Sequence, residues 1–473
     1  MNSVLLSLYH HLPEPARSIA AGMRGYVLRR WRYGPETEDL VEEALDRETW
    51  SSERWRAWQE ERLVCILCRA ATMVPYYREH WAERRRNGDR RSWEDLENWP
   101  ILEKEFLREN PKAFLVDTCT IRHMFHEHTS GTTGKPLDLW WSPDAVRSWY
   151  ALFEARCRRW YGVSRHDRWA VLGGQLITPV NQRRPPFWVW NRALNQLYMS
   201  SYHLTPDLVP SYLDALVRYR ITYLYGYPSS LYALAQGVLA RGRTDLGMAV
   251  AVTNAEPLFD YQREAIAGAF QCPVRETYGM AEIVTAASQC EAGRLHLWPE
   301  VGVVELVEGD RVSGNGTAGE LVCTGLLNAD MPLVRYRVGD CGTLAPKPVS
   351  SCACGRSLPV LASLEGRFDD VLYTSDGRRV GRLDPVFKKR LPILEAQIIQ
   401  EALDRVRVRY VPALNYTAKA GDAIIDGLRA RLGAIDVILD AVDKVPRDAN
   451  GKFRAVICHL PPDERNRLNG MSG

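Results

Sequence analysis

The sequence of 473 residues lacks the features that mark several protein classes. It has no run approaching the ~20 apolar residues that a membrane-spanning helix needs. Its 11 cysteines are too sparse for a disulfide scaffold, which points to a reducing compartment. The net charge is only +3, so no basic field indicates nucleic acid as a partner. Met1–Leu8 is apolar but has neither a basic leading segment nor a long apolar run after it, so we expect no secretory signal and a cytoplasmic protein.

Lysine is also scarce in this chain. Only nine of its 61 basic residues are lysine, and the rest are arginine. Lysine carries a compact ammonium charge, whereas arginine carries a bulky planar fork, so each lysine raises the question of whether an ammonium is required there. Lys135 and Lys452 both lie in glycine-containing segments and are therefore candidate functional cations.

The composition is that of a globular protein, with 46% hydrophobic and 25% charged residues, and the length predicts two to four folding units. Residues 1–110 are rich in Trp, Arg, Glu and Leu and are predicted to be helical. Over residues 111–366, runs such as RWAVLGG and ITYLYGYP alternate with helical stretches, which predicts an α/β core with mostly parallel sheets. Later runs such as VGVVELVEG predict an added antiparallel subdomain, and residues 367–473 predict a small α+β domain.

The segment Met1–Tyr33 combines a possible apolar stripe with five arginines and one glutamate. One interpretation is a helical arm that packs on its own protein, or on a second subunit in a homodimer. Another is a basic amphipathic element that rests on an anionic membrane surface. The sequence leaves both open.

The segment Thr129–Pro136, TSGTTGKP, has the composition of a phosphate-binding loop. Glycines let the main chain fold tightly around an anion, backbone N–H groups and hydroxyls donate to phosphate oxygens, and Lys135 adds charge. It is not a Walker A loop, because Pro136 stands where that motif needs Ser or Thr.

TSGTTGKP resembles the phosphate loop of the adenylate-forming superfamily, which includes the acyl- and aryl-CoA synthetases. Other segments resemble that family's motifs in the expected order: NAEPL (254–258), ETYGMAE (276–282), RYRVGD (335–340), GRFDD (366–370) and NGK (450–452). YGYPSSL and the cysteine motifs resemble the phenylacetate–CoA ligase branch. VPYYREHW and GKFRAVI are most similar to its CapK-like members, which are associated with capsular polysaccharide.

The resemblance implies an ATP-dependent ligase. A carboxylate would attack the α-phosphate of ATP to give acyl-AMP and pyrophosphate, and the acyl group would then pass to coenzyme A. An amine acceptor, giving an amide, is the main alternative. A nucleotide-binding scaffold without activity is a minor one, which the intact Lys135, Glu282, Asp340, Arg367 and Lys452 disfavour.

The resemblance also implies roles for individual residues. The β- and γ-phosphates would be held by Thr129, Ser130, Gly131, Thr132, Thr133, Gly134 and Lys135. The adenine slot would be formed by Ala255, Glu256, Pro257 and Tyr278. The α-phosphate and its Mg²⁺ would be handled by Thr277 or Glu282, and the ribose by Asp340 and Arg367. Lys452 would be the catalytic cation of a mobile C-terminal domain that turns about a hinge at Asp369.

In the resembled family, the acyl site lies near the residues that correspond to Tyr225, Gly226, Tyr227 and Gly279. The tyrosines favour an aromatic or amphipathic acid over a long fatty chain. Phe187 and Trp188 lie in the aromatic stretch Gly173–Trp190 and could line the same pocket or belong to the core.

Two pairs of possible metal ligands, Cys290 with His296 and Cys352 with Cys354, could together close a tetrahedral zinc site. The CACG pair resembles a zinc-binding feature of the phenylacetate–CoA ligase branch, so we expect a structural Zn²⁺. For Cys65 and Cys68, which lie in a helical run, we expect core packing. We expect His123, His126 and His128 to lie on a strand edge, without a metal.

Overall fold

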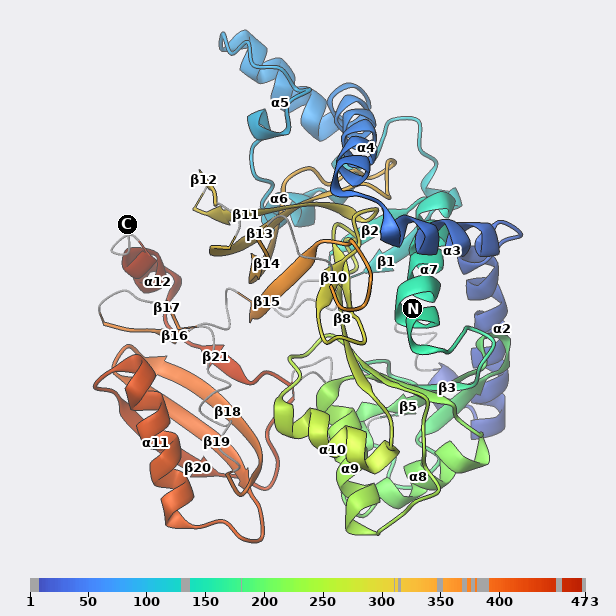
Figure 1. The fold of residues 1–473 in the computed structure, drawn as a ribbon, viewed down its shortest axis with the longest axis vertical. Coiled ribbons are helices and arrows are strands. Elements are labelled where there is room, and N and C mark those ends of the chain that lie inside the picture. Colours follow the sequence, from blue (N-terminus) through green and yellow to red (C-terminus); the bar gives the residue numbers. More distant parts are fainter. Residues whose placement is uncertain are drawn as a thin grey trace.

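The computed structural model describes residues 8–128, 137–179, 181–309, 311–313, 316–346, 352–367, 372–375, 379–380, 391–447 and 453–469. They form a large lobe built on a 13-stranded sheet and a small lobe built on a four-stranded sheet (Figure 1). This is the expected mixed α/β architecture. Among the described residues, no helix combines the length and the apolar character needed to cross a membrane.

The N-terminal part of the chain is helical, with α2 (Glu14–Arg32), α3 (Thr37–Asp46), α4 (Ser52–Met73), α5 (Pro75–Arg86) and α6 (Lys104–Glu109). Ser51 caps α4 by accepting a hydrogen bond from the Arg54 backbone, and Pro75 begins α5 where no N–H donor is needed. Aromatic side chains such as Tyr77, Trp81 and Trp99 are buried and bind these helices to the large lobe.

Half of the long sheet is parallel and lies between two layers of helices. Its strands run in the order β8 (Val274–Gly279), β7 (Ala251–Thr253), β6 (Tyr223–Gly226), β3 (Trp169–Gly173) and β5 (Gln196–Ser200), with antiparallel β4 (Trp188–Asn191) at the edge. One face packs against α8 (Val209–Arg218), α9 (Pro228–Ala240) and α10 (Asp260–Phe270). The other face carries α7 (Pro143–Cys157), whose Phe153 contacts Tyr225. Burial on both faces explains why these strands read as continuous apolar runs.

The other half of the same sheet is antiparallel. It contains β9 (Ala286–Gln289), β10 (Leu295–Leu297), β15 (Val360–Arg367), β14 (Tyr336–Leu344), β13 (Ala318–Gly325), β11 (Gly302–Glu308) and β12 (Arg311–Val312). The two halves are continuous because β8 pairs with β7 in parallel and with β9 in antiparallel. A separate hairpin of β1 (Phe125–His128) and β2 (Asp138–Trp141) flanks the phosphate-loop segment, which itself lies outside the described residues.

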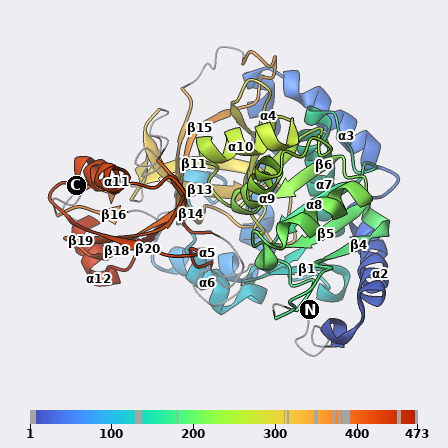
Figure 2. The ribbon, with the colours of Figure 1, turned by 90° about the horizontal axis from the view of Figure 1, so that it is seen from below.

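The small lobe is an α+β unit. Its sheet has the order β20 (Asp436–Ala441), β19 (Arg405–Pro412), β18 (Ile393–Ala402) and β21 (Val456–Cys458), and α11 (Ala418–Leu432) packs against it through Ile424 and Leu428. The short strands β16 (Leu372–Tyr373) and β17 (Arg379–Val380) and the helix α12 (Pro462–Asn469) complete the lobe. Figures 1 and 2 both place it at the side of the large lobe opposite to α2.

A buried ionic cluster fixes the N-terminal helices to the sheet. The guanidinium of Arg156, which is fully buried on α7, donates to both carboxylate oxygens of Glu300 at 2.7 and 2.8 Å and to Glu48 at 3.5 Å. Glu48 also accepts hydrogen bonds from Trp160 and Arg356. Since every charge has a partner, the cluster can remain buried.

Removing one partner should therefore be costly. We expect Arg156→Ala to lower the free energy of unfolding by about 3–5 kcal/mol, because Glu300 and Glu48 would remain buried without their cation. Urea unfolding followed by tryptophan fluorescence measures this loss. The control is Arg159→Ala. Arg159 is more exposed and pairs with the exposed Glu38, so its removal should cost about 1 kcal/mol or less. Equal losses for both variants would contradict the prediction.

Candidate functional site

The segments that resemble nucleotide-binding motifs meet at one edge of the parallel sheet. Tyr225–Tyr227 end β6, Asn254–Pro257 follow β7, and Tyr278 and Gly279 end β8. The carboxyl ends of neighbouring parallel strands lie side by side, and this is where open α/β sheets bind ligands. The topology therefore brings together three segments that lie some 25 residues apart in the chain.

Tyr278 and Asp340 are in direct contact. The Tyr278 hydroxyl, on β8, donates to Oδ2 of Asp340, on β14, at 2.6 Å. Burial, reinforced by the charge of Asp340, raises the pKa of Tyr278 well above its usual value, so the hydroxyl remains a donor. Asp340 is also the backbone pairing partner of Arg367 on β15, although the Arg367 side chain lies outside the described residues. The candidate adenine contact and the candidate ribose acceptor thus adjoin.

Glu282 is buried and has two donors in the ligand-free protein. Its Oε1 accepts a hydrogen bond from the Tyr336 hydroxyl at 3.0 Å. The same oxygen forms an ion pair with Lys104 Nζ at 2.9 Å. Lys104 is the first residue of α6, far from Glu282 in the sequence. Sequence analysis did not assign a role to Lys104, although the scarcity of lysine was a signal that could have drawn attention to it.

The backbone around Glu282 is strained. Ile283, a buried β-branched residue, has φ of +44°, and Ala255 in the neighbouring loop has φ of +64°. Such conformations cost about 1–3 kcal/mol each and persist only where surrounding contacts impose them. Here Trp141 Nε1 donates to the Ala281 carbonyl at 3.1 Å, and the Ile283 amide bonds to Met280. These contacts fix the turn that presents Glu282.

Thr277 and Tyr225 are hydrogen-bonded to each other beside the segments that resemble nucleotide-binding motifs. The Thr277 hydroxyl donates to the Thr253 carbonyl at 2.9 Å and is also bonded to Tyr225. Burial raises the pKa of Tyr225, so its hydroxyl is neutral. Phe153, on α7, lies edge-on to the Tyr225 ring at 5.6 Å.

Glycine is required at one of the candidate acyl-site positions. A Cβ on Gly226 would lie 2.5 Å from the Leu172 carbonyl oxygen, so no side chain fits there. A Cβ on Gly279 would lie 3.4 Å from the ring of Trp149. Tyr227 accepts a hydrogen bond from the Gly174 amide at 3.1 Å. Trp149 and Phe153 are thus neighbours of this region that sequence analysis missed, because α7 lies far from it in the chain.

Phe187 and Trp188 do not line this region. Phe187 is fully buried and stacks on His203 and Tyr212, with ring centroids 4.6 and 5.8 Å apart. Trp188 lies edge-on to Tyr212. Both belong to the core between the sheet and α8, which is one of the two interpretations that the sequence left open.

Glu256 connects the two lobes. One of its oxygens accepts a hydrogen bond from the Ser229 amide at 3.1 Å, and the other accepts one from the Phe453 amide at 2.6 Å. Burial raises the pKa of Glu256. Phe453 directly follows Lys452 in the sequence. The residue after the NGK motif therefore contacts the NAEPL segment, which contains Glu256. Lys452, Asp369, Lys135 and Thr129–Gly134 lie outside the described residues.

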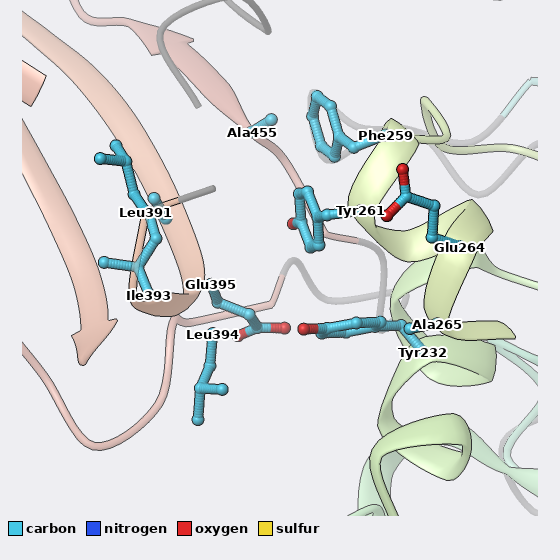
Figure 3. Close-up of a pocket in the computed structure, with 11 residues that line it drawn as sticks. Tyr232, Phe259, Tyr261, Glu264, Ala265, Leu391, Ile393, Leu394, Glu395 and Ala455 are labelled. Atoms are coloured by element: carbon cyan, nitrogen blue, oxygen red, sulfur yellow. The ribbon is translucent and has the colours of Figure 1, made fainter. Parts of the chain in front are cut away.

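A groove of about 430 Å³ separates the lobes next to this contact (Figure 3). The large lobe lines it with aromatic side chains from α9 and the start of α10: Tyr232, Phe259 and Tyr261. The small lobe lines it with aliphatic side chains at the beginning of β18: Leu391, Ile393 and Leu394. Of the part of the chain that the structure describes, Glu264 and Glu395 are the charged residues that line it, and Glu395 is paired with Arg447.

The four expected zinc ligands come together. One ligand atom from each of Cys290, His296, Cys352 and Cys354 lies within 4.8 Å of all the others. The Cys290 and Cys352 sulfurs are 3.7 Å apart, and Cys354 Sγ is 3.4 Å from His296 Nε2. Tetrahedral Zn²⁺ with bonds of about 2.1–2.3 Å separates its ligand atoms by about 3.4–3.8 Å, so the residues fit this ion.

The surroundings of the four residues also suit a metal. His296 Nδ1 bonds to the Leu358 carbonyl at 3.0 Å, which leaves Nε2 facing Cys354. Burial lowers the pKa of His296 and favours the neutral imidazole. Burial opposes ionisation of Cys354, but hydrogen bonds from the Arg356 backbone and from Cys352 lower its pKa overall. Burial raises the pKa of Cys290 to about 11, so its deprotonation would be coupled to binding of the metal.

The other cysteines and histidines singled out in the sequence lie on α4 and on or next to β1. Cys65 and Cys68 are both exposed on α4, so core packing was the wrong prediction: that helix buries Ile66 and Leu67 instead. His126 and His128 lie on β1 as expected, but His123 ends a short 3-10 helix, Ile121–His123, so a strand position was the wrong prediction for it. His126 has a carboxylate partner, Asp138, at 2.8 Å.

Comparisons with known proteins agree with this architecture. Residues 372–459 match the CapK C-terminal domain family. CapK from Staphylococcus aureus is 24% identical over 469 residues, covering 96% of this chain and 99% of CapK. Phenylacetate-coenzyme A ligase from Pseudomonas putida is 27% identical over 343 residues, covering 69% of this chain and 73% of the ligase. The crystal structure of 2-hydroxyisobutyryl-CoA ligase with 2-HIB-AMP, in the postadenylation state, has a TM-score of 0.67 at 20% identity, covering 90% of this chain and 93% of that chain.

A large lobe with a long mixed sheet, followed by a small α+β lobe, is the fold of the adenylate-forming ligases. The chain has this fold. Within it, the chain is a homologue of CapK and of the phenylacetate–CoA ligases, as the resemblance of its motifs predicted.

The cysteine–histidine cluster leads to a measurable expectation. Protein purified without chelator should contain about one equivalent of zinc by elemental analysis, because four soft donors are already arranged for that ion. Cys352→Ser should lose the metal and lower the melting temperature, whereas Cys272→Ser, which changes a buried cysteine outside the cluster, should retain it. Freshly purified protein without zinc would contradict the assignment.

Proposed function

We propose that this protein uses ATP to convert a carboxylic acid to acyl-AMP and then transfers the acyl group to coenzyme A. The observation that carries the proposal is the contact between Tyr278 and Asp340 at the carboxyl edge of β8, beside the NAEPL segment. Three of the segments that resemble nucleotide motifs, NAEPL, ETYGMAE and RYRVGD, lie near one another, and the small lobe contacts the first of them through Glu256 and Phe453. The names of the phenylacetate–CoA ligase relatives support coenzyme A as the acceptor.

The first step must bring two anions together, the carboxylate and the triphosphate. The protein lowers the barrier by holding both in line for attack and by placing cations around them. Lys135 in the phosphate loop and Lys452 in the small lobe are the proposed cations. Glu282 has the carboxylate that suits Mg²⁺, and that ion would supply further positive charge to the phosphates. Asp340 is the proposed acceptor for the ribose hydroxyls.

Lys104 adds an ammonium to this set. It is bonded to Glu282, so it lies where the α-phosphate and the metal ligand are expected. With Glu282 engaged by a metal ion, Lys104 would be able to turn its ammonium toward a phosphate oxygen. In its present position it compensates the buried charge of Glu282.

The acid is proposed to be aromatic or amphipathic. Tyr225 with its neutral hydroxyl, the ring of Trp149 against Gly279, and Phe153 surround the candidate acyl region with aromatic surface. Such rings favour a flat or short apolar acid that carries a polar group for Tyr225 or Thr277.

An amine acceptor is the second candidate, and the interlobe groove favours it. Among the described residues, the charged side chains that line the groove are Glu264 and Glu395, the latter paired with Arg447, and its walls are aromatic and aliphatic. A cationic or neutral amine suits such a lining better than the phosphates of coenzyme A. The product would then be an amide.

Pyrophosphate release tests the proposal. Incubation with ATP, Mg²⁺ and a panel of aromatic, amphipathic and fatty acids should give release above background with one class of acid, because formation of acyl-AMP does not need the acceptor. Lys452→Ala should reduce this release strongly. Absence of release with every acid would contradict the proposal and favour a scaffold without activity.

The same assay separates the two acceptors. Added coenzyme A should accelerate turnover and give a thioester detectable by mass spectrometry. Release that is unaffected by coenzyme A but accelerated by amines would favour the amide-forming alternative.

The role of Lys104 can be tested separately. Lys104→Ala should lower kcat/KM for pyrophosphate release about 100-fold, the loss typical of removing one well-placed donor to a developing charge. Lys112→Ala, which removes an exposed lysine from the next turn of chain, should leave the rate unchanged. A rate that differs from the wild type by less than twofold, in a Lys104→Ala protein with an unchanged melting temperature, would show that Lys104 only neutralises Glu282.

A further inference from the structure

The outer face of α2 exposes a concentration of large apolar side chains. Of the described residues, six such side chains lie between positions 8 and 27, and we call them the apolar strip: Leu8, Leu12, Ile19, Met23, Tyr26 and Val27. On α2 itself, Ile19, Met23, Tyr26 and Val27 are 65, 68, 56 and 58% exposed. Their spacing of three and four residues places them along one side of the helix.

The apolar strip cannot turn toward the protein, because the opposite face of α2 is fixed. Ser18 Oγ accepts a hydrogen bond from the Trp190 amide at 3.2 Å, and Arg17 donates to Gln182 Oε1 at 3.2 Å. Gly25 lies so close to β4 that a Cβ there would be 2.0 Å from Asn191 Oδ1. The helix therefore presents its apolar side outward as a rigid edge of the molecule.

The charges around the apolar strip are mostly positive, and the one acidic residue of α2, Glu14 in its first turn, accepts a hydrogen bond from Ser18. Arg24, Arg29 and Arg30 are exposed on α2, and between residues 15 and 35 the sequence contains no Asp or Glu. The loop that carries Gln182 adds Arg183 and Arg184, which are exposed beside the start of the helix. An apolar stripe bordered by arginines is the pattern of helices that lie in the interface of an anionic bilayer.

We propose that the apolar strip and its arginines form a docking surface for an anionic phospholipid membrane. The apolar side chains would enter the boundary between headgroups and acyl chains, and the arginines would pair with lipid phosphates. A second copy of the chain fits less well, because the exposed Arg24, Arg29 and Arg30 would then face the same arginines of the other copy. In Figures 1 and 2 the small lobe lies on the far side of the molecule from α2, so docking leaves its movement unobstructed.

Sedimentation with vesicles tests this surface. The full-length protein should bind vesicles of phosphatidylglycerol and phosphatidylcholine at low salt, bind pure phosphatidylcholine much more weakly, and dissociate as salt is raised. Arg29→Gln with Arg30→Gln should weaken binding about 30-fold. Ile19→Asn with Met23→Gln should weaken it about tenfold or more.

The matched control is Val217→Asn with Leu239→Gln, which removes two exposed apolar side chains from α8 and α9 and should not change binding. Absence of a preference for anionic vesicles, or apolar-strip variants that bind like the wild type, would overturn the proposal. Light scattering could also overturn the proposal, by showing that the wild type is a dimer and that the apolar-strip variants are monomers. The surface would then bind a second copy of the chain. Pyrophosphate release without vesicles should be the same in all variants, which separates this proposal from the proposed function.

Discussion

The site depends on the pairing of a single strand, β8, which is parallel to β7 on one edge and antiparallel to β9 on the other. This junction makes one sheet from two halves of different topology. It brings Asp340, which belongs to the antiparallel half, against Tyr278 at the end of the parallel half. Hydrogen bonds of the backbone fix the register, so the distance between these side chains is set by the sheet and not by a flexible loop.

The second constraint is that buried carboxylates need a cation beside them, and the structure meets it in two places. Arg156 neutralises two buried glutamates beneath the N-terminal helices, and Lys104 neutralises Glu282 at the site. Both pairs join segments more than 100 residues apart. The N-terminal helices are therefore part of the site as well as its support, because α6 begins with the lysine that contacts Glu282.

The two lobes meet at a small number of polar contacts and a groove. Glu256 accepts hydrogen bonds from both lobes, and burial raises its pKa although these two donors lower it. Aromatic side chains of one lobe face aliphatic side chains of the other without filling the space between them. An interface of this kind can separate at modest cost, which suits a ligase whose second step needs access for an acceptor.

The resemblance to the adenylate-forming superfamily, the alternation of strands and helices, and the four residues of the cysteine–histidine cluster could be predicted from the sequence, because they depend on local patterns and short motifs. The sequence could not place Lys104, Trp149 or Phe153 at the site, nor assign Phe187 to the core. Those positions follow from which segments the sheet brings together, and no local signal carries that information. It also left open whether the first helix packs inward or outward. The structure shows that α2 packs on β4 through the side that carries Gly25. A glycine is needed there because a Cβ would clash with Asn191 of β4.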